Sequence, residues 1–181
     1  LVEADEAIRP DTTVEVLAKL RPVGSPEGSH TAGNAPGVND GAGAVVAASE
    51  DWAKQQGRTP IARVLAYGTV ADDFAYLART PAKAAKQALE KIDKSPRDVD
   101  LWEINEAFAS VTLNSIRMLN IDEERVNVNG GAVAIGHPIG ASGGRVLVTL
   151  LFEMQKRNAK KGLATLCIGG GMGIAMCIAR D

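Results

Sequence analysis

The stretch GLATLCIGGGMGIAMCIA, residues 162–179, contains two short apolar runs separated by a cluster of glycines. Leu163–Ile168 and Ile174–Ala179 predict two strands, and the turn Gly169–Gly173 between them predicts an antiparallel pair. Because this glycine turn leads into a strand instead of a helix, it does not match a dinucleotide-binding fingerprint.

Upstream of this hairpin, apolar runs of strand length alternate with segments of helical periodicity. The expected strands are Ile61–Val70, Val99–Ile104 and Val126–Val128. The expected helices begin at Thr80, which would cap Pro81, at Asn105 and at Ser142. The order β-α-β-α-β-α-β-β predicts an α/β fold, with helices packed on a mixed, mostly parallel sheet.

The N-terminal third is less regular. Residues 1–40 are punctuated by prolines and glycines and predict mostly loop, with a helical turn or two around Val14–Leu20. The apolar run Gly43–Ser49 is typical of a strand buried on both faces, and Glu50–Gly57 predicts a short helix. Leu1 is not a methionine, and the opening LVEADEAIRP has no signal-peptide character. We therefore expect a fragment or processed subunit of a longer protein.

Composition excludes several classes of protein. The 181 residues include 20 Lys and Arg against 22 Asp and Glu, a formal charge of −2, so a nucleic-acid partner is not expected. No apolar run is long enough to predict a membrane span. The two cysteines do not suggest a disulfide scaffold and are typical of a reducing compartment, so we expect a cytoplasmic protein.

Three polar clusters fall where the predicted strands end. Asn105 opens the segment NEAFA, His137 lies between Gly136 and Gly140, and Cys167 precedes the glycine turn. Ligand sites in parallel sheets form at the carboxyl ends of the strands. An imidazole can carry a proton, and backbone N–H groups beside a thiol can form an oxyanion hole. The three residues therefore predict one catalytic pocket.

Each of these residues also has an ordinary structural interpretation. Asparagine is a good helix N-cap, and Glu106 would suit the first turn of the same helix. His137 could bond a loop carbonyl, and Cys167 could be a small buried apolar side chain, as we expect for Cys177. The sequence contains neither a phosphate-binding P-loop motif nor a zinc-ligand spacing, so no metal is expected.

Four segments together resemble the thiolase family, in particular its acetyl-CoA acetyltransferase branch. They are TAGNAPGVNDGAGAV at 31–45, NEAFA at 105–109, VNVNGGAVAIGHPIGASGG at 126–144 and GLATLCIGGGMG at 162–173. The resemblance covers essentially the whole chain in order. It implies reversible Claisen condensation of acetyl-CoA to acetoacetyl-CoA, with CoA as substrate and product and no other cofactor.

The resemblance also implies that a first half is missing. Thiolases contain two related halves of the predicted topology plus a loop domain, and the nucleophilic cysteine lies in the first half. Residues 1–38 then correspond to the tail of the loop domain, 39–58 to the last strand and helix of the first half, and 59–181 to the C-terminal domain. The expected partners are an N-terminal half carrying the nucleophile, an acyl-CoA, and further copies in a dimer or tetramer.

The roles that the resemblance implies fall on matching residues. His137 would activate the missing nucleophile and lend Nε2 to an oxyanion hole, and Asn105 would hold the water that completes it. Cys167 would act as general acid and base, and the N–H of Gly169 would help form a second oxyanion hole. The expected substrate-binding residues are Arg9 at the nucleotide and Phe108 and Met172 at the acyl group. Val16 and Pro36 replace serines that contact CoA in some relatives.

Three alternatives remain open on the sequence. One is a non-enzymatic CoA-binding or assembly module, and another is a thiolase for longer 3-ketoacyl chains. The third is a relative of the ketoacyl synthases, which use two catalytic histidines. In this chain the second histidine, His30, falls in the loop region, and Cys167 occupies the thiolase position.

Overall fold

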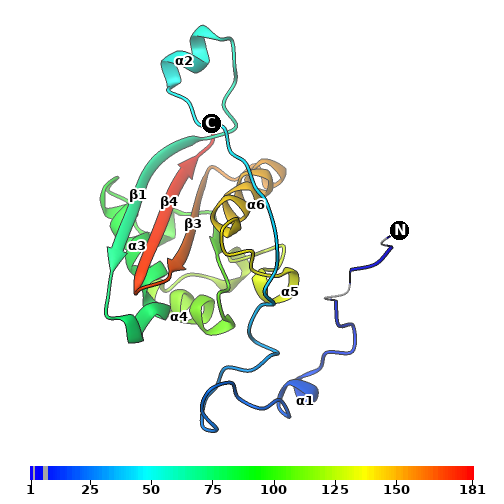
Figure 1. Cartoon of the computed structure of the whole chain (residues 1–181). Coiled ribbons are helices and arrows are strands. Elements are labelled where there is room, and N and C mark those ends of the chain that lie inside the picture. The colour runs from blue at the N-terminus through cyan, green and yellow to red at the C-terminus, as the bar shows by residue number, and fades with distance from the viewer. Residues whose placement is uncertain (2, 6–7) are drawn as a thin grey trace.

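The computed structural model describes residues 1, 3–5 and 8–181. Its centre is a four-stranded sheet in the order β1-β4-β3-β2 (Figure 1). The strands are β1 (Arg63–Ala71), β2 (Leu101–Ile104), β3 (Lys161–Ile168) and β4 (Met172–Ala179). β4 runs antiparallel to both β1 and β3, whereas β2 and β3 are parallel. The expected mixed α/β sheet is confirmed, although only one pair of neighbours is parallel.

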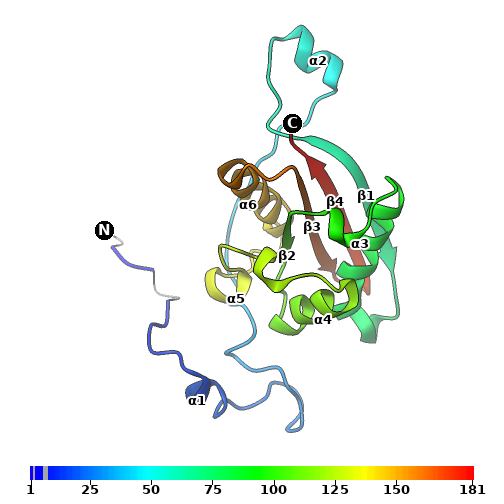
Figure 2. The same cartoon turned by 180° about the vertical axis from the view of Figure 1, so that it is seen from behind.

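Helices cover both faces of this sheet. The longer ones are α3 (Thr80–Glu90), α4 (Ala109–Leu119) and α6 (Ser142–Arg157). α3 and α4 lie behind the sheet in Figure 1 and in front of it in Figure 2, opposite α6. Side chains alternate accordingly along β3, because Leu163 packs in the α3 core and Ala164 in the α6 core. The helix predicted to begin at Ser142 and the predicted hairpin are both confirmed.

Glycines allow α3 to lie directly on the sheet. A Cβ at Gly68 would overlap the carbonyl oxygen of Ala84, and one at Gly173 would lie 2.7 Å from the carbonyl oxygen of Thr80. On its side of this contact, α3 has buried alanines instead of large side chains. Close packing of backbone on backbone replaces the usual interdigitation of large residues.

The expected strand Gly43–Ser49 does not form in this chain. These residues have no regular structure and are exposed, and they run along α6 (Figure 1), where Gly43 approaches Gly144. A strand needs a neighbour to take its backbone hydrogen bonds, and the four strands of the described sheet provide none. The short helices on either side, α1 (Val14–Leu17) and α2 (Glu50–Gln55), form as expected.

Val126–Val128 does not form the expected strand either. Val126 makes only an isolated parallel bridge to Trp102. Beyond it the side chain of Asn127 takes the place of a backbone strand: Oδ1 accepts from Ile104 N–H and Nδ2 donates to Ile104 O, both at 2.8 Å. Asn127 has a φ of 47°, which bends the chain away from the sheet.

Two predicted helix starts are displaced. The helix expected from Asn105 begins at Ala109, so Asn105 is not its N-cap. Glu106 likewise serves another helix, because its carboxylate accepts from Val133 N–H at 2.9 Å in the short α5 (Ala132–Ile135). α3 includes Thr80 as its first residue, and its cap is Arg79, the end of the 3-10 segment Phe74–Arg79. Two further 3-10 turns are Pro96–Asp98 and Glu123–Arg125.

Candidate active site

The buried side chain of Asn105 lies directly after β2. Its backbone N–H donates to Thr165 O of β3 at 3.0 Å, which continues the parallel ladder by one bond. The side chain is 1% exposed, and its Nδ2 lies 3.3 Å from Nε2 of His137. On its other side Arg145 donates to Oδ1 at 3.0 Å. The amide is thus held between a cation and an imidazole.

His137 lies in a loop and not at the end of a strand. It follows α5, and Gly136 before it has a φ of 93°, where a Cβ would also overlap the side chain of Asn39. The expectation that His137 directly follows a strand is therefore wrong, because Val126–Val128 forms none. Its Nδ1 lies 2.6 Å from Oγ of Ser142, and this buried hydroxyl donates to Pro138 O at 3.0 Å.

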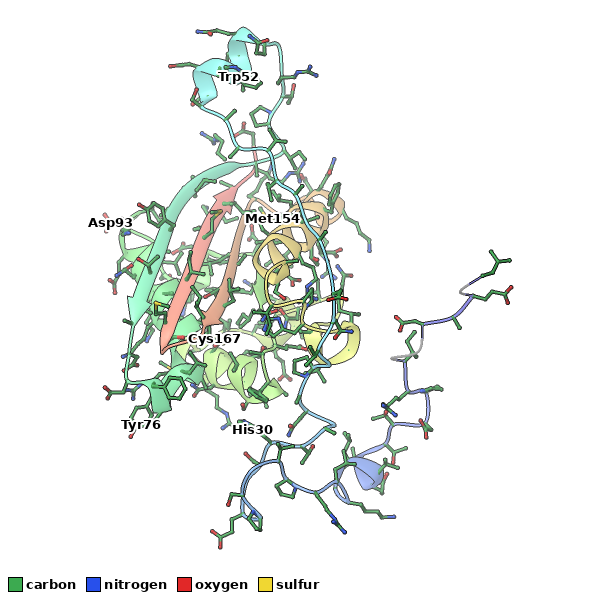
Figure 3. All side chains as sticks on the ribbon, viewed as in Figure 1. His30, Trp52, Tyr76, Asp93, Met154 and Cys167 are labelled. Atoms are coloured by element: carbon green, nitrogen blue, oxygen red, sulfur yellow. The ribbon has the colours of Figure 1, made fainter. Side chains whose placement is uncertain are left out.

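Cys167 lies at the same end of the sheet as Asn105, where the parallel strands β2 and β3 both finish. It is the last residue but one of β3, two residues beyond Thr165, and is partly exposed (Figure 3). Gly169 follows in the turn and is exposed, and Gly170 and Gly171 both have a φ of 85°. Among the described residues, no hydrogen bond joins the thiol to Asn105 or His137. The sheet therefore brings the three residues to one edge, and two of them into contact.

Burial shifts the pKa of both titratable groups toward their neutral forms. Burial lowers the pKa of His137, and the positive charge of Arg145 lowers it further. Burial also raises the pKa of the Cys167 thiol. At neutral pH the pair is therefore a neutral imidazole, which can accept a proton, and a thiol, which can give one.

The expected substrate-binding residues are more dispersed. Phe108 precedes α4 and stacks on His30, and Met172 begins β4 opposite Ile168, so both lie near the sheet edge that holds Cys167. Arg9 is exposed in the N-terminal segment, which projects away from the sheet (Figure 1). The structure does not bring Arg9 to the other residues.

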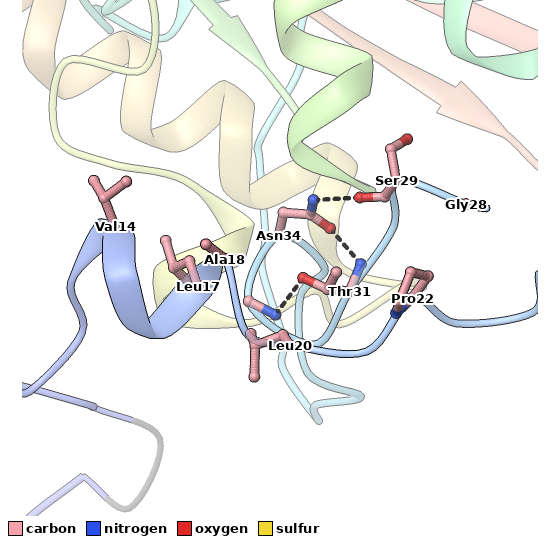
Figure 4. A pocket seen from close by; sticks show the side chains of 10 residues that line it. Val14, Leu17, Ala18, Leu20, Pro22, Gly28, Ser29, Thr31 and Asn34 are labelled. Atoms are coloured by element: carbon pink, nitrogen blue, oxygen red, sulfur yellow. Dashed lines mark hydrogen bonds between the residues drawn. The ribbon is translucent and has the colours of Figure 1, made fainter. Parts of the chain in front are cut away.

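A hollow of about 470 Å³ lies between α1 and the loop that follows it (Figure 4). Leu17, Leu20 and Thr31 are among its lining residues, and Asn34 fixes the loop by accepting from Thr31 N–H at 2.8 Å. None of the three clustered residues lines this hollow. It belongs to the loop segment instead of the sheet edge.

Sequence reasoning missed the groups that orient the site. Ser142 and Arg145 are the fifth and eighth residues after His137, and from the first turn of α6 they contact His137 and Asn105, respectively. Their signal in the sequence was a polar helix start directly before the mostly apolar run Val146–Phe152. Glu103 is a third omission: it is 5% exposed in β2, and burial raises the pKa of its carboxyl to about 8.

The described part of the chain contains neither a metal-binding cluster nor a membrane-spanning helix. There, no group of three or more His, Cys, Asp or Glu side chains is arranged to hold a metal ion. Nor do these residues contain a helix with the length and apolar character that crossing a membrane requires.

Comparison with known proteins identifies the family of this chain. Residues 58–180 match the family model of the thiolase C-terminal domain, and residues 1–51 match that of the thiolase N-terminal domain. The acetyl-CoA acetyltransferase of Paracoccus denitrificans is 55% identical over 99% of this chain, and the probable acetyl-CoA acetyltransferase of Escherichia coli is 51% identical over 100%. Each alignment covers 46% of the relative, so the chain spans about half the length of the curated relatives it matches.

Solved structures show the same fold. The acetyl-CoA acetyltransferase of Bacillus anthracis matches 97% of this chain and 44% of its own, with a TM-score of 0.90 and 45% identity. Human mitochondrial 3-ketoacyl-CoA thiolase in complex with CoA matches 99% of this chain and 46% of its own, with a TM-score of 0.89 and 41% identity. On its sequence, its fold and its family models, the chain belongs to the thiolase family.

Proposed function

We propose that this chain is the C-terminal part of an acetyl-CoA acetyltransferase, which condenses two acetyl-CoA molecules reversibly to acetoacetyl-CoA and CoA. The observation that carries the proposal is the 3.3 Å contact between Asn105 and His137 on the sheet edge that also contains Cys167. A base, an amide donor and a thiol beside exposed glycine N–H groups are what proton transfer and thioester activation require.

The proposed reaction has two stages. Nε2 of His137 takes the proton of a cysteine thiol on the N-terminal half, and the thiolate attacks acetyl-CoA, while Cys167 gives its proton to the departing CoA sulfur. The Cys167 thiolate then removes an α-proton from a second acetyl-CoA. The resulting carbanion attacks the acetyl-enzyme thioester and expels the enzyme thiolate, which gives acetoacetyl-CoA. In the first stage one thioester replaces another of similar energy, so the acetyl transfer to the enzyme can run in both directions.

Oxyanion stabilisation in this scheme comes from two places. His137 Nε2, once protonated, and a water on Asn105 face the carbonyl oxygen of the first acyl group, and Gly169 N–H faces that of the other. Phe108 and Met172 enclose the acyl group, and Arg9 contacts the nucleotide of CoA. CoA enters as substrate and product, and no metal or other cofactor is required.

The relatives' length supports a missing partner segment, since each is about twice as long as this chain. The proposed assignment is 1–38 to the loop domain, 39–58 to the end of the first half and 59–181 to the C-terminal domain. The exposed segment Gly43–Ser49 would then gain a sheet neighbour from the first half. Dimer or tetramer formation and a cytoplasmic location stay predictions.

Reconstitution tests the proposal. The chain is mixed with, or joined to, a thiolase N-terminal half, and thiolysis of acetoacetyl-CoA by CoA is followed. We expect activity from the combination and none from either part. Cys167→Ala should reduce kcat by roughly 10²–10⁴-fold, the usual contribution of an acid–base group. Cys177→Ala is the matched control, because that buried cysteine is given no chemical role.

Two other functions make different predictions in the same assay. A non-enzymatic CoA-binding module would bind CoA but give no thiolysis in the reconstituted pair. A longer-chain 3-ketoacyl-CoA thiolase, suggested by the human mitochondrial structure at 42% identity, would cleave 3-ketohexanoyl-CoA faster than acetoacetyl-CoA. The ratio of kcat/KM for the two substrates decides between the thiolases.

A further inference from the structure

The side-chain amide of Asn105 has only one orientation that satisfies both of its neighbours. Arg145 NH2 lies 3.0 Å from one amide atom, and a guanidinium can only donate hydrogen bonds. The atom facing it is therefore the oxygen Oδ1. The NH2 group, Nδ2, must then face His137, at 3.3 Å from Nε2.

This orientation fixes the protonation pattern of the neutral imidazole. An amide NH2 group only donates, so Nε2 of His137 must accept and carry a lone pair. The single N–H of the ring is then on Nδ1, which points at Ser142 Oγ at 2.6 Å. Ser142 is free to accept it, because its own hydroxyl proton goes to Pro138 O. These four hydrogen bonds form one series from Arg145 to Pro138, in which each group donates to the next.

We infer that Arg145 is a positioning residue that acts through Asn105 to hold His137 as the Nδ1–H tautomer, with Nε2 unprotonated. The inference deepens the proposed function, on which its catalytic meaning rests. In the first step the S–H bond of the partner's nucleophilic cysteine breaks and an Nε2–H bond forms. The products are a thiolate and an imidazolium whose Nδ1–H remains bonded to Ser142.

Burial strengthens the preference for this orientation of the Asn105 amide and for this tautomer of His137. Asn105 is 1% exposed and Ser142 is fully buried, so water does not compensate a reversed bond. A flipped amide would place its NH2 group against the guanidinium, and an unsatisfied buried polar group costs about 1–3 kcal/mol. Burial and Arg145 also lower the pKa of His137, so the ring is neutral at pH 7 and its tautomer is defined.

Nitrogen NMR reads the tautomer directly. A reconstituted enzyme in which only this chain carries ¹⁵N-histidine gives signals from two rings, because His30 and His137 are its two histidines. His30→Gln identifies the His137 signals. We expect an unprotonated Nε2 and a protonated Nδ1 at pH 7. The opposite pattern in the unsubstituted enzyme overturns the inference, whatever the activity.

Two variants test the role of Arg145. Arg145→Met removes the cation that orients the amide, so both tautomers should appear, and kcat should fall roughly tenfold with little change in KM, since loss of a charged hydrogen bond is worth about one factor of ten or more. Arg180→Met is the matched control, because Arg180 is also partly buried but donates to Met154 O, away from the site. An unchanged tautomer in Arg145→Met contradicts the inference.

Asn105→Asp gives a second test that does not need the arginine variant to fold. The carboxylate accepts from Arg145 and from the imidazole, so the His137 proton should move to Nε2. If Nε2 stays unprotonated in that variant, the inference is wrong. Because tautomers are read without turnover, an inactive enzyme with the expected tautomer would reject the proposed function and leave this inference standing.

Discussion

The imidazole ring of His30 stacks on the phenyl ring of Phe108, with centroids 4.4 Å apart and an interplanar angle of 8°. Nε2 of the same histidine lies 2.9 Å from Ser110 Oγ, across 80 residues of sequence. Ala109 N–H also donates to Asn34 O at 2.9 Å. The N-terminal loop is thereby joined to the first turn of α4 through one aromatic ring and two hydrogen bonds.

Replacing His30 by alanine should loosen this loop without unfolding the sheet. An aromatic pair and a hydrogen bond are each worth about 0.5–1.5 kcal/mol, so local opening should become roughly tenfold more frequent. Amide hydrogen exchange at Val23, which donates to His30 O at 2.7 Å, measures it. Ser110→Ala should show a smaller increase, and unchanged exchange in His30→Ala would show that the stacking stabilises nothing.

Glu103 should make the protein less stable as pH rises from 5 to 8. The folded-state pKa of its carboxyl is raised to about 8 from an ordinary 4.5, mainly by burial. Its stabilising effect is therefore complete below pH 4.5 and is lost as the carboxyl ionises toward pH 8. Urea unfolding of wild type and Glu103→Gln at several pH values tests this. The difference between the two curves isolates Glu103 from His137, and a difference that does not grow with pH would contradict the prediction.

Gly68→Ala should destabilise the fold, because the new methyl group would overlap the Ala84 carbonyl oxygen in α3. Overpacking of this kind costs about 1–3 kcal/mol, and the obstacle here is backbone that cannot rotate aside. Gly140→Ala is the control, since its Cβ would meet no atom within 4 Å. Equal urea midpoints for the two variants would mean that α3 moves away from the sheet at little cost.

The two cysteines should differ in their reaction with iodoacetamide in the native chain. Cys177 is fully buried, and burial raises its pKa to about 11, so it should react only after unfolding. Cys167 is partly exposed, and burial also raises its pKa, so it should react slowly at pH 7.5. Peptide mapping by mass spectrometry separates the sites, with urea-unfolded chain as reference. Faster reaction of native Cys167 than of the unfolded thiol would show that the site stabilises a thiolate.

Local sequence patterns predicted the parts of the fold that local interactions determine. The hairpin at Gly169–Gly173 follows from glycine placement, and α6 follows from its apolar periodicity. Gly43–Ser49 failed for the opposite reason, because its apolar pattern matches a strand but the described sheet offers no neighbour. Val126–Val128 failed because a side chain, Asn127, replaced the backbone in bonding to β2.

The site was predicted in part. Its residue types and their position at one sheet edge followed from the motifs, and the contact of Asn105 with His137 agrees with the expected pocket. The orienting groups Ser142 and Arg145 could not be assigned from the sequence, because their role depends on how the start of α6 faces the loop. The catalytic roles themselves stay predictions.

The sheet order has a consequence for how this protein is made. Ala71 at the end of β1 pairs with Met172, so β1 leaves the ribosome long before β4, its neighbour in the described sheet, exists. At the usual ~5–20 residues per second, the wait for the intervening hundred or so residues is about 5–20 s. During that interval the nascent strand exposes unpaired backbone and apolar side chains, and chaperones that shield emerging polypeptides should decide the yield of folded protein.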